Sequence, residues 1–408
     1  MLKEIKRERY LSKIRPFYEQ DLIKVITGIR RCGKSILLTQ VIKELKDNMI
    51  QDNQIIYINF EFEKFSKLNN DKNLYKYVVE KMVNINKYKY YLFFDEIQNV
   101  AKWEKLINSF KAEYGEKVSI FITGSNSDLL SGELATHLAG RYVSFKINPF
   151  SFKEVCELTG KIDLNKYDLE ADFFDYVKWG GLPQRFAQTD ELRTITYLSD
   201  VFDSIVVKDI IERFSIKDLD LLNRVIEYIV TTPSQTFSAE NLSDYFLKND
   251  KRNVSKETLY NYLEYMSIAL LINKVNRYDV RGKRILNGKY KYYLTDLGLG
   301  QIKSVNKREQ MGAYLENIVY NELVIRGYNV NVGNLVDGEI DFIATRYNEK
   351  IYIQVAYILA DEGVIEREFG AYKSIEDNFP KYVITMDKVE QSQNGIIHKN
   401  IVDWLLEE

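Results

Sequence analysis

Histidine and cysteine are scarce in this sequence, at two residues each among 408. His137 and His398, with two scattered cysteines, cannot assemble a Cys/His zinc site, and their scarcity argues against histidine-based catalysis. Cys32 and Cys156 lie far apart along the chain and give no disulfide framework. The cysteine content therefore indicates a reducing compartment.

Excess charge is also missing: 57 Lys and Arg side chains face 59 Asp and Glu, a net charge of −2. Binding of nucleic acid through bulk charge is thereby excluded, and only a local basic patch can serve it. The sequence contains no apolar window long enough to span a bilayer, and residues 1–9 are too charged for a signal segment. We expect a cytoplasmic protein without membrane contact, built from two to four domains.

Residues 28–35 fit the phosphate-binding pattern GxxxxGK[ST]. A β-branched run at 23–26 precedes the pattern and a helical periodicity at 35–42 follows it, which is the order that a phosphate loop requires. A chance glycine-rich turn is the alternative. We expect Lys34 to contact the β- and γ-phosphates and the Ser35 hydroxyl to bind Mg²⁺. The residues predicted to surround the nucleotide are Gly28, Ile29, Arg30, Arg31, Cys32, Gly33, Lys34, Ser35 and Ile36.

An apolar run that ends in two acids, residues 91–96, predicts the second half of an ATPase site. Asp95 would hold Mg²⁺ through its water shell, and Glu96 would polarise the attacking water. An acidic cap for the following segment is the simpler alternative. Residues 54–60 and 118–123 predict two further strands of the same sheet.

Two more side chains are candidates for catalysis. Asn126, or else Ser125, follows the strand 118–123 and would contact the γ-phosphate or the lytic water, although turn chemistry also favours these residue types. Arg141 would stabilise charge on the transferring phosphoryl group of its own subunit or of a neighbour. A solvated surface arginine is the alternative for Arg141.

Together these segments resemble a known family. KVITGIRRCGKSILL, YLFFDEIQNVAKWE, SIFITGSNSDLLS and LAGRYVSFKINPFSFKE look like the bacterial and archaeal AAA-type ATPases that carry a C-terminal domain of unknown function 4143. The later segments 179–183, 207–210 and 292–299 resemble the same family. The resemblance implies a module related to AAA+ and signal-transduction ATPases, with ATP and Mg²⁺ as its ligands.

The middle of the chain reads as helices. Residues 150–214 show amphipathic periodicity and predict a lid beside the nucleotide, with the break at 180–183 acting as a hinge or a plain connector. Residues 215–307 follow a winged-helix pattern: three helices and a basic hairpin at 274–293. Such domains also serve as protein-packing modules, and a basic hairpin is often only solvated. The candidate DNA contacts are Lys256, Arg277, Arg281, Lys283, Arg284 and Lys289.

Residues 308–408 resemble the PD-(D/E)XK nuclease core. Glu316, Asp341 and Gln354 match the positions that hold Mg²⁺ in that superfamily, but position 356, where its lysine belongs, is Ala356. Lys350 is a poor substitute by strand geometry. The resemblance therefore favours a degenerate nuclease fold over an active nuclease, and the acids are alternatively the polar face of a hairpin.

The sequence thus predicts an α/β protein with a P-loop NTPase core of AAA type and a parallel sheet at 1–149, a helical lid at 150–214, a winged helix at 215–307 and a nuclease-like domain at 308–408. The leading hypothesis is an ATP-hydrolysing switch that couples nucleotide state to double-stranded DNA or to a protein partner. An ATP-dependent nuclease and a STAND-like signalling ATPase that forms homo-oligomers are the alternatives.

Overall fold

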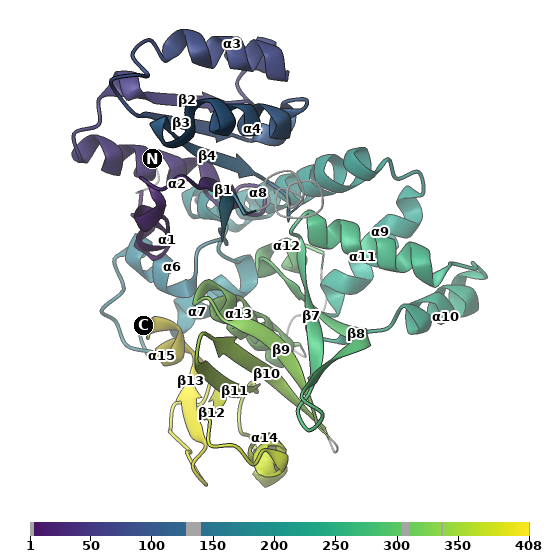
Figure 1. Cartoon of the computed structure of the whole chain (residues 1–408). Coiled ribbons are helices and arrows are strands. Elements are labelled where there is room, and N and C mark those ends of the chain that lie inside the picture. Colours follow the sequence, from purple (N-terminus) through teal and green to yellow (C-terminus); the bar gives the residue numbers. More distant parts are fainter. Residues whose placement is uncertain (1–3, 128–139, 304–309, 336–337, 408) are drawn as a thin grey trace. The chain divides into compact units, whose positions relative to one another are not determined.

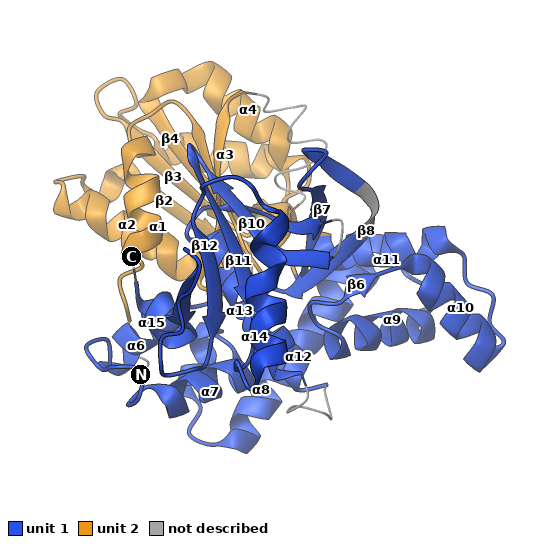
Figure 2. Cartoon of the chain, turned by 90° about the horizontal axis from the view of Figure 1, so that it is seen from below, with its two compact units in different colours: residues 1–3, 149–267, 271–408 blue, residues 4–148, 268–270 orange. Residues whose placement is uncertain are grey.

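A computed structural model of the chain describes residues 4–127, 140–303, 310–335 and 338–407 (Figure 1). The chain divides into two compact units, coloured separately in Figure 2. Unit 2 comprises residues 4–148 and 268–270, and unit 1 comprises 149–267 and 271–408. The first predicted boundary, after residue 149, lies beside the division between the units, whereas the predicted boundaries after 214 and 307 fall inside unit 1.

Unit 2 is built on a five-stranded sheet in the order β2-β3-β4-β1-β5, with every neighbouring pair parallel. Its strands are β1 (Ile23–Thr27), β2 (Ile55–Asn59), β3 (Tyr90–Asp95), β4 (Val118–Gly124) and β5 (Tyr142–Lys146). Its helices are α1 (Glu8–Ile14), α2 (Lys34–Asp47), α3 (Asp71–Lys81) and α4 (Trp103–Tyr114). The strand run that was predicted from apolar character alone, β3, is buried along its whole length, as a central parallel strand must be.

The core of unit 2 forms where helices cover this sheet. Leu92 and Phe94 of β3 pack in one apolar cluster with Leu106 and Phe110 of α4 and with the inner face of α3. On alternate positions of the same strand, Phe93 stacks on Phe121 of β4 with ring centroids 4.6 Å apart. Because side chains alternate along a strand, both faces of β3 are apolar, and helices are needed on both.

Unit 1 begins with helices and continues into one mixed sheet. Its helical elements are α6 (Phe152–Thr159), α7 (Glu170–Trp179), α8 (Glu191–Ser204), the π-helix η8 (Ile205–Glu212), α9 (Leu219–Thr231), α10 (Ala239–Asp250), α11 (Lys256–Ile268), α12 (Leu297–Gln301), α13 (Met311–Ile325), α14 (Glu362–Gly370) and α15 (Ile401–Leu406). The helices predicted as a lid pack inside unit 1, α7 and α8 on α12, and α6 on α15.

The sheet of unit 1 has eight strands in the order β13-β12-β11-β10-β9-β7-β8-β6. They are β6 (Thr236–Phe237), β7 (Ile272–Asp279), β8 (Arg284–Leu294), β9 (Asn329–Leu335), β10 (Gly338–Arg346), β11 (Glu349–Val355), β12 (Lys381–Thr385) and β13 (Ile397–Asn400). The basic hairpin β7–β8 joins the C-terminal strands through the parallel pair β7–β9. Two segments that the sequence separates at residue 307 therefore share one hydrogen-bonded sheet.

The glycine pair predicted as a hinge or connector is tightly packed. A Cβ on Gly180, which has a φ of 70°, would lie 1.9 Å from Asp296 Oδ1, and one on Gly298 would lie 2.1 Å from Trp179 O. Gly181 N and Gly298 N donate hydrogen bonds to the Asp296 carboxylate at 2.7 and 2.9 Å. Burial raises the pKa of Asp296 to about 6 despite these bonds. This contact, called the lock below, consists of Gly180, Gly181, Asp296 and Gly298 and joins two sequence motifs between α7 and α12.

Candidate functional site

The phosphate loop connects β1 to α2 in unit 2. A Cβ on Gly28 would lie 2.4 Å from Ile147 O and 2.7 Å from Cys32 Sγ, so only glycine fits there. Gly33 immediately precedes α2 with a φ of 103°, a conformation that glycine adopts without strain. No side chain caps the first turn of α2, which leaves its N–H groups facing the loop. Such a helix start attracts an anion.

Lys34 is buried inside this loop. Its Nζ donates hydrogen bonds to Gly28 O at 3.0 Å and Ile29 O at 3.4 Å, and it pairs with Glu96 Oε1 at 3.2 Å. Burial alone would lower the pKa of Lys34, but the Glu96 carboxylate outweighs it, so the pKa is raised and the ammonium stays charged. The structure therefore brings the loop lysine against Glu96, the acid that directly follows β3.

Asp95 is fully buried and accepts three hydrogen bonds from the two strands beside β3. Tyr57 OH and Asn59 Nδ2, both of β2, bind Oδ2 at 2.8 Å, and Thr123 Oγ1 of β4 binds Oδ1 at 2.5 Å. The same Thr123 hydroxyl accepts the Glu96 N–H at 2.9 Å. Asp95 is thus fixed in orientation before any ligand arrives. Sequence reasoning missed Tyr57, Asn59 and Thr123, although all lie near strand ends that a parallel sheet gathers at one edge.

Glu96 lies in the left-handed region, at a φ of 56°, which turns its side chain toward the loop lysine. Gln98 Nε2 donates a hydrogen bond of 2.5 Å to Glu96 Oε2. Burial would raise the pKa of Glu96, but Lys34 and Gln98 together hold it below the ordinary value. Ser125 and Asn126 are buried directly after β4, and Ser125 Oγ lies 3.5 Å from Gln98 Nε2. The predicted role of Asn126 stays a prediction.

The remaining loop residues differ in exposure. Ile29 and Cys32 are buried, and Cys32 is a free thiol. Arg30 pairs with Glu61 at 3.5 Å. Arg31 is exposed, Ser35 is partly buried and Ile36 is half exposed. The partial exposure of Ser35 is compatible with its predicted role as an Mg²⁺ ligand.

Arg141 lies at the amino ends of β1 and β5, whereas the phosphate loop follows the carboxyl end of β1. Its carbonyl accepts the Ile23 N–H at the start of β1, because β5 runs parallel to β1 and begins at Tyr142. The phosphate loop follows the opposite end of β1, beside Lys146. A role for Arg141 on the nucleotide of its own subunit is therefore a prediction that the strand direction corrects. Its role toward a neighbouring subunit stays a prediction.

The second candidate metal cluster does assemble in unit 1. Asp341 N donates to Gln354 Oε1 at 3.0 Å, and Lys291 Nζ lies 3.0 Å from Glu316 Oε1 and 3.8 Å from Asp341 Oδ1. The predicted ligands are thus neighbours, but an ammonium group lies among them. Within the described ranges, no group of three or more His, Cys, Asp or Glu side chains is arranged to hold a metal ion. The residues present do not fit the Mg²⁺ that the sequence predicts.

Two other positions near this cluster have different environments. Ala356 is buried after β11 and donates its N–H to Ile384 O. Lys350, at the opposite end of β11, pairs with Asp377 at 3.1 Å.

The candidate DNA contacts fall into two groups. Arg281, Lys283 and Arg284 are exposed where the hairpin β7–β8 turns. Lys256 pairs with Glu240 at 2.6 Å on the surface, and the backbone of Lys289 lies in β8. Arg277 is mostly buried, donates to Asn334 Oδ1 at 2.6 Å and pairs with Glu339 at 3.2 Å. The prediction of Arg277 as a DNA contact is corrected, because its guanidinium is used inside unit 1.

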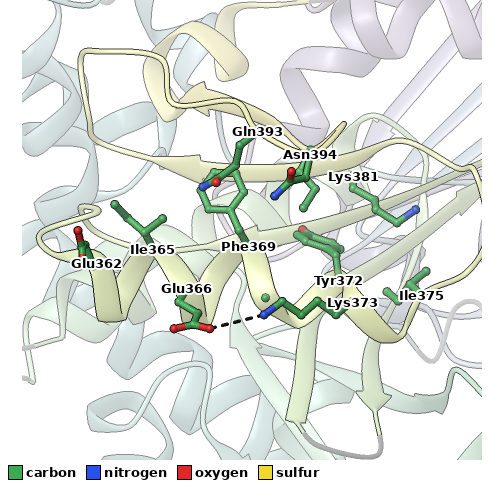
Figure 3. A pocket seen from close by; sticks show the side chains of 12 residues that line it. Glu362, Ile365, Glu366, Phe369, Tyr372, Lys373, Ile375, Lys381, Gln393 and Asn394 are labelled. Atoms are coloured by element: carbon green, nitrogen blue, oxygen red, sulfur yellow. Dashed lines mark ion pairs between the residues drawn. The ribbon is translucent and has the colours of Figure 1, made fainter.

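A separate hollow of about 500 Å³ lies along α14 (Figure 3). Ile365, Phe369 and Tyr372 contribute apolar surface to it, and a Glu366–Lys373 ion pair of 3.6 Å crosses its rim. Its lining residues include none of the predicted site residues. In the described part of the chain, no helix has both the length and the apolar character needed to cross a membrane.

Comparisons with known families match two segments. Residues 20–156 match the AAA domain, and residues 170–309 match a domain of unknown function (DUF8612). These matches do not confirm the predicted C-terminal domain of unknown function 4143: the domain of unknown function that matches is DUF8612, and it covers the helical middle and the hairpin. Motifs 179–183 and 292–299, which meet in the lock between α7 and α12, lie inside it.

Related proteins extend over the whole chain. An uncharacterized protein of Haemophilus influenzae is 38% identical over 404 residues, 99% of each chain. The uncharacterized protein MJ1544 of Methanocaldococcus jannaschii is 34% identical over 369 residues, 87% of this chain and 79% of the relative. The solved structure of Cdc6p from Pyrobaculum aerophilum is 12% identical, covers 78% of this chain and 95% of its own, and has a TM-score of 0.32, too low to support an argument. The phosphate loop and the acidic end of β3 lie within the AAA segment, and the chain belongs to the same family as these two uncharacterized relatives.

Proposed function

We propose that this protein hydrolyses ATP and uses the nucleotide state to control binding by unit 1. The observation that carries the proposal is the meeting of Lys34 with Glu96, next to the fixed Asp95, at the carboxyl edge of a parallel sheet. In this proposal Ser35 binds Mg²⁺, which neutralises phosphate charge, Asp95 holds the ion through its water shell, and Glu96 polarises the attacking water. Asn126, buried directly after β4, would contact the γ-phosphate or that water.

The contacts of Lys34 suggest how the site changes when a nucleotide enters. Its ammonium is held by one carboxylate and two backbone carbonyls, Gly28 O and Ile29 O. Phosphate oxygens are stronger acceptors for an ammonium than neutral carbonyls. Lys34 therefore turns to the phosphates, and Glu96 loses its cation and becomes available to water.

Double-stranded DNA is the ligand of unit 1 that the exposed hairpin turn favours. Arg281, Lys283 and Arg284 lie together at this turn, after the three helices α9, α10 and α11. Arg281 and Lys283 lie in the turn itself, and Arg284 begins β8, where its Nε lies 3.9 Å from Asp279 Oδ2. Three exposed cations so close together can track phosphates even when the net charge of the chain is near zero. A protein partner and nucleotide-dependent assembly of several copies are the other outcomes of the tests below.

The first experiment measures ATP turnover of the parent chain, Lys34→Ala and the matched control Lys43→Ala. Lys43 is an exposed lysine of the same helix, so its removal tests for general effects of losing a cation from α2. We expect turnover in the parent and the control only. Turnover that survives Lys34→Ala would overturn the assigned site.

The second experiment repeats the assay with duplex DNA, for the parent and for the triple variant Arg281→Ala, Lys283→Ala, Arg284→Ala. Stimulation that the triple variant loses, and that weakens with rising salt, supports DNA as the ligand. If the rate of ATP turnover is the same with and without DNA, the result favours a protein partner. Light scattering with ATP, ADP and no nucleotide then separates a monomeric enzyme from a protein that assembles on binding ATP.

A further inference from the structure

A buried lysine lies at the place where the sequence predicts a metal ion. Lys291 of β8 is 5% exposed. Its Nζ lies 2.5 Å from Glu339 Oε1, 3.0 Å from Glu316 Oε1 and 3.8 Å from Asp341 Oδ1. The three carboxylates come from α13 and β10, whereas the lysine comes from the basic hairpin. A buried ammonium is tolerated only with such partners.

The other oxygen atoms that a metal would need are already engaged. Val355 N donates to Asp341 Oδ2 at 2.8 Å. Asp341 N donates to Gln354 Oε1 at 3.0 Å, so the amide oxygen of Gln354 faces the backbone. Tyr293 OH adds a hydrogen bond of 2.7 Å to Glu316 Oε1. Glu316 Oε1, Asp341 Oδ2 and Gln354 Oε1 thus help to hold β8, β10, β11 and α13 together.

The charges of the cluster are balanced from the hairpin side. Arg277 of β7 pairs with the second oxygen of Glu339 at 3.2 Å, while Lys291 pairs with the first. Three carboxyl groups therefore lie against two cations. A divalent ion added beside Lys291 would bring two cations within contact of each other. Lys291 occupies the position among these oxygens that a metal ion would take.

We propose that Lys291 is a resident cation that takes the place of a divalent metal, closes this carboxylate cluster to metal ions and fastens the hairpin β7–β8 to the C-terminal strands. The C-terminal part of the chain is then a binding and structural body rather than a metal-dependent nuclease. Its metal position is filled by a side chain that arrives from a different segment, about 25 residues before the first acid of the cluster.

Removing the ammonium while keeping the apolar stem, with Lys291→Met, should open a metal site. The probe is Mn²⁺ alone, titrated without nucleotide and followed by calorimetry and by electron paramagnetic resonance. We expect saturable binding of one Mn²⁺ per chain to Lys291→Met and none to the wild type. The double variant Lys291→Met, Asp341→Asn should lose the binding again, because it removes an acid from the cluster.

Lys274→Met is the matched control. Lys274 belongs to the same hairpin, but its ammonium lies 4.1 Å from the centre of the Tyr290 ring. This variant should remain metal-free like the wild type. Binding of Mn²⁺ by the wild type that Asp341→Asn abolishes would overturn the proposal, and so would a folded Lys291→Met that binds no Mn²⁺. If Lys291→Met does not fold, the wild type and Asp341→Asn alone decide: no saturable binding in either supports a closed cluster. The outcome is independent of ATP turnover, because the phosphate loop belongs to unit 2.

Discussion

Removing Lys34 or Glu96 alone should lower the free energy of unfolding more than removing both would suggest, because the two side chains form an ion pair. The loss in the double variant should therefore be smaller than the sum of the two single losses. Both side chains are buried, and Nζ lies 3.2 Å from Oε1. At an effective dielectric constant of about 20, their attraction amounts to about 5 kcal/mol. Much of it is offset by the loss of hydration of two buried charges. A coupling energy of about 2–4 kcal/mol is therefore expected in the nucleotide-free protein.

The two single variants should lose different amounts of the free energy of unfolding. Lys34→Met leaves Glu96 buried with the Gln98 amide but without its cation, which costs about 3–5 kcal/mol. Glu96→Gln leaves Lys34 with two backbone carbonyls, so the loss is about 1–3 kcal/mol. The double variant has no unpaired charge. Its loss should fall short of the sum of the single losses by the coupling energy.

Unfolding must be followed in unit 2 alone, since a chain with two units need not unfold in one step. The sequence has three tryptophans, and Trp103 is the one in α4 of unit 2. Replacing Trp179 and Trp404 by Phe lets urea unfolding be read from Trp103 fluorescence. Lys43→Met serves as the control for losing a lysine from α2. Additive losses, with a coupling below about 0.5 kcal/mol, would refute the buried pair.

The coupling should also depend on pH in one direction. The folded-state pKa of Glu96 is held below its ordinary value of 4.5. An acid with a lowered pKa stabilises the folded state above its ordinary pKa and loses this contribution as pH falls through the lowered value. The coupling measured at neutral pH should therefore persist down to the ordinary pKa and be lost as pH falls from there through the lowered pKa. Coupling that grows on acidification would contradict the assignment.

Three further predictions concern stability and turnover. Asp296 has its pKa raised from 3.8 to about 6, so the folded state should lose about 3 kcal/mol relative to Asp296→Asn as pH rises from about 4 to 7, measured by urea unfolding at each pH; a pH-independent difference would contradict this. Gly298→Ala places a Cβ 2.1 Å from a backbone carbonyl and should cost about 3 kcal/mol or more, whereas the helical control Gly312→Ala meets no atom within 4 Å and should change stability by less than about 1 kcal/mol. Thr123→Val removes a hydrogen bond to Asp95 and should lower ATP turnover about 10- to 100-fold, while Thr123→Ser should retain it; equal turnover in both variants would exclude this role.

Local sequence patterns predicted much of unit 2 because its site is built from contiguous segments. A strand, a glycine loop and a helix follow one another within about twenty residues, and the acids directly end β3. Tyr57 and Asn59 could not be found in this way. Their contacts with Asp95 depend on β2 lying next to β3, which is a pairing between segments about 35 residues apart.

The position of Arg141 relative to the phosphate loop depends on the direction of β5. From the sequence it follows the predicted strand 118–123 by a short distance, and it precedes the segment 142–146. Only the parallel pairing of β5 with β1 shows that the start of this strand lies at the edge away from the phosphate loop. Residues that precede and follow a strand lie close together in the sequence, but in the fold the length of the strand separates them.

The basic hairpin shows the limit of counting charges. From the sequence, the cations of this hairpin were expected to lie on the surface, but Arg277 and Lys291 form ion pairs inside unit 1. Alternation along β7 and β8 places some of these side chains toward α13 and β10, and the acids that receive them come from segments more than twenty residues later. A charge cluster in a sequence therefore does not reveal whether its counter-charges come from solvent, from a ligand or from the same chain.

The two buried lysines of this protein use the same attraction with opposite consequences. Lys34 has one carboxylate and otherwise neutral carbonyls as partners, and the oxygens of a triphosphate are stronger acceptors than those carbonyls. Lys291 has three carboxylates within 4 Å, contributed by two elements that would both have to separate before it left. An entering ligand can displace the first lysine, but a metal ion would have to compete with a cation that is covalently part of the sheet. On this reasoning the loop of unit 2 is built to exchange its charge partner, and the carboxylate cluster of unit 1 is built to keep it.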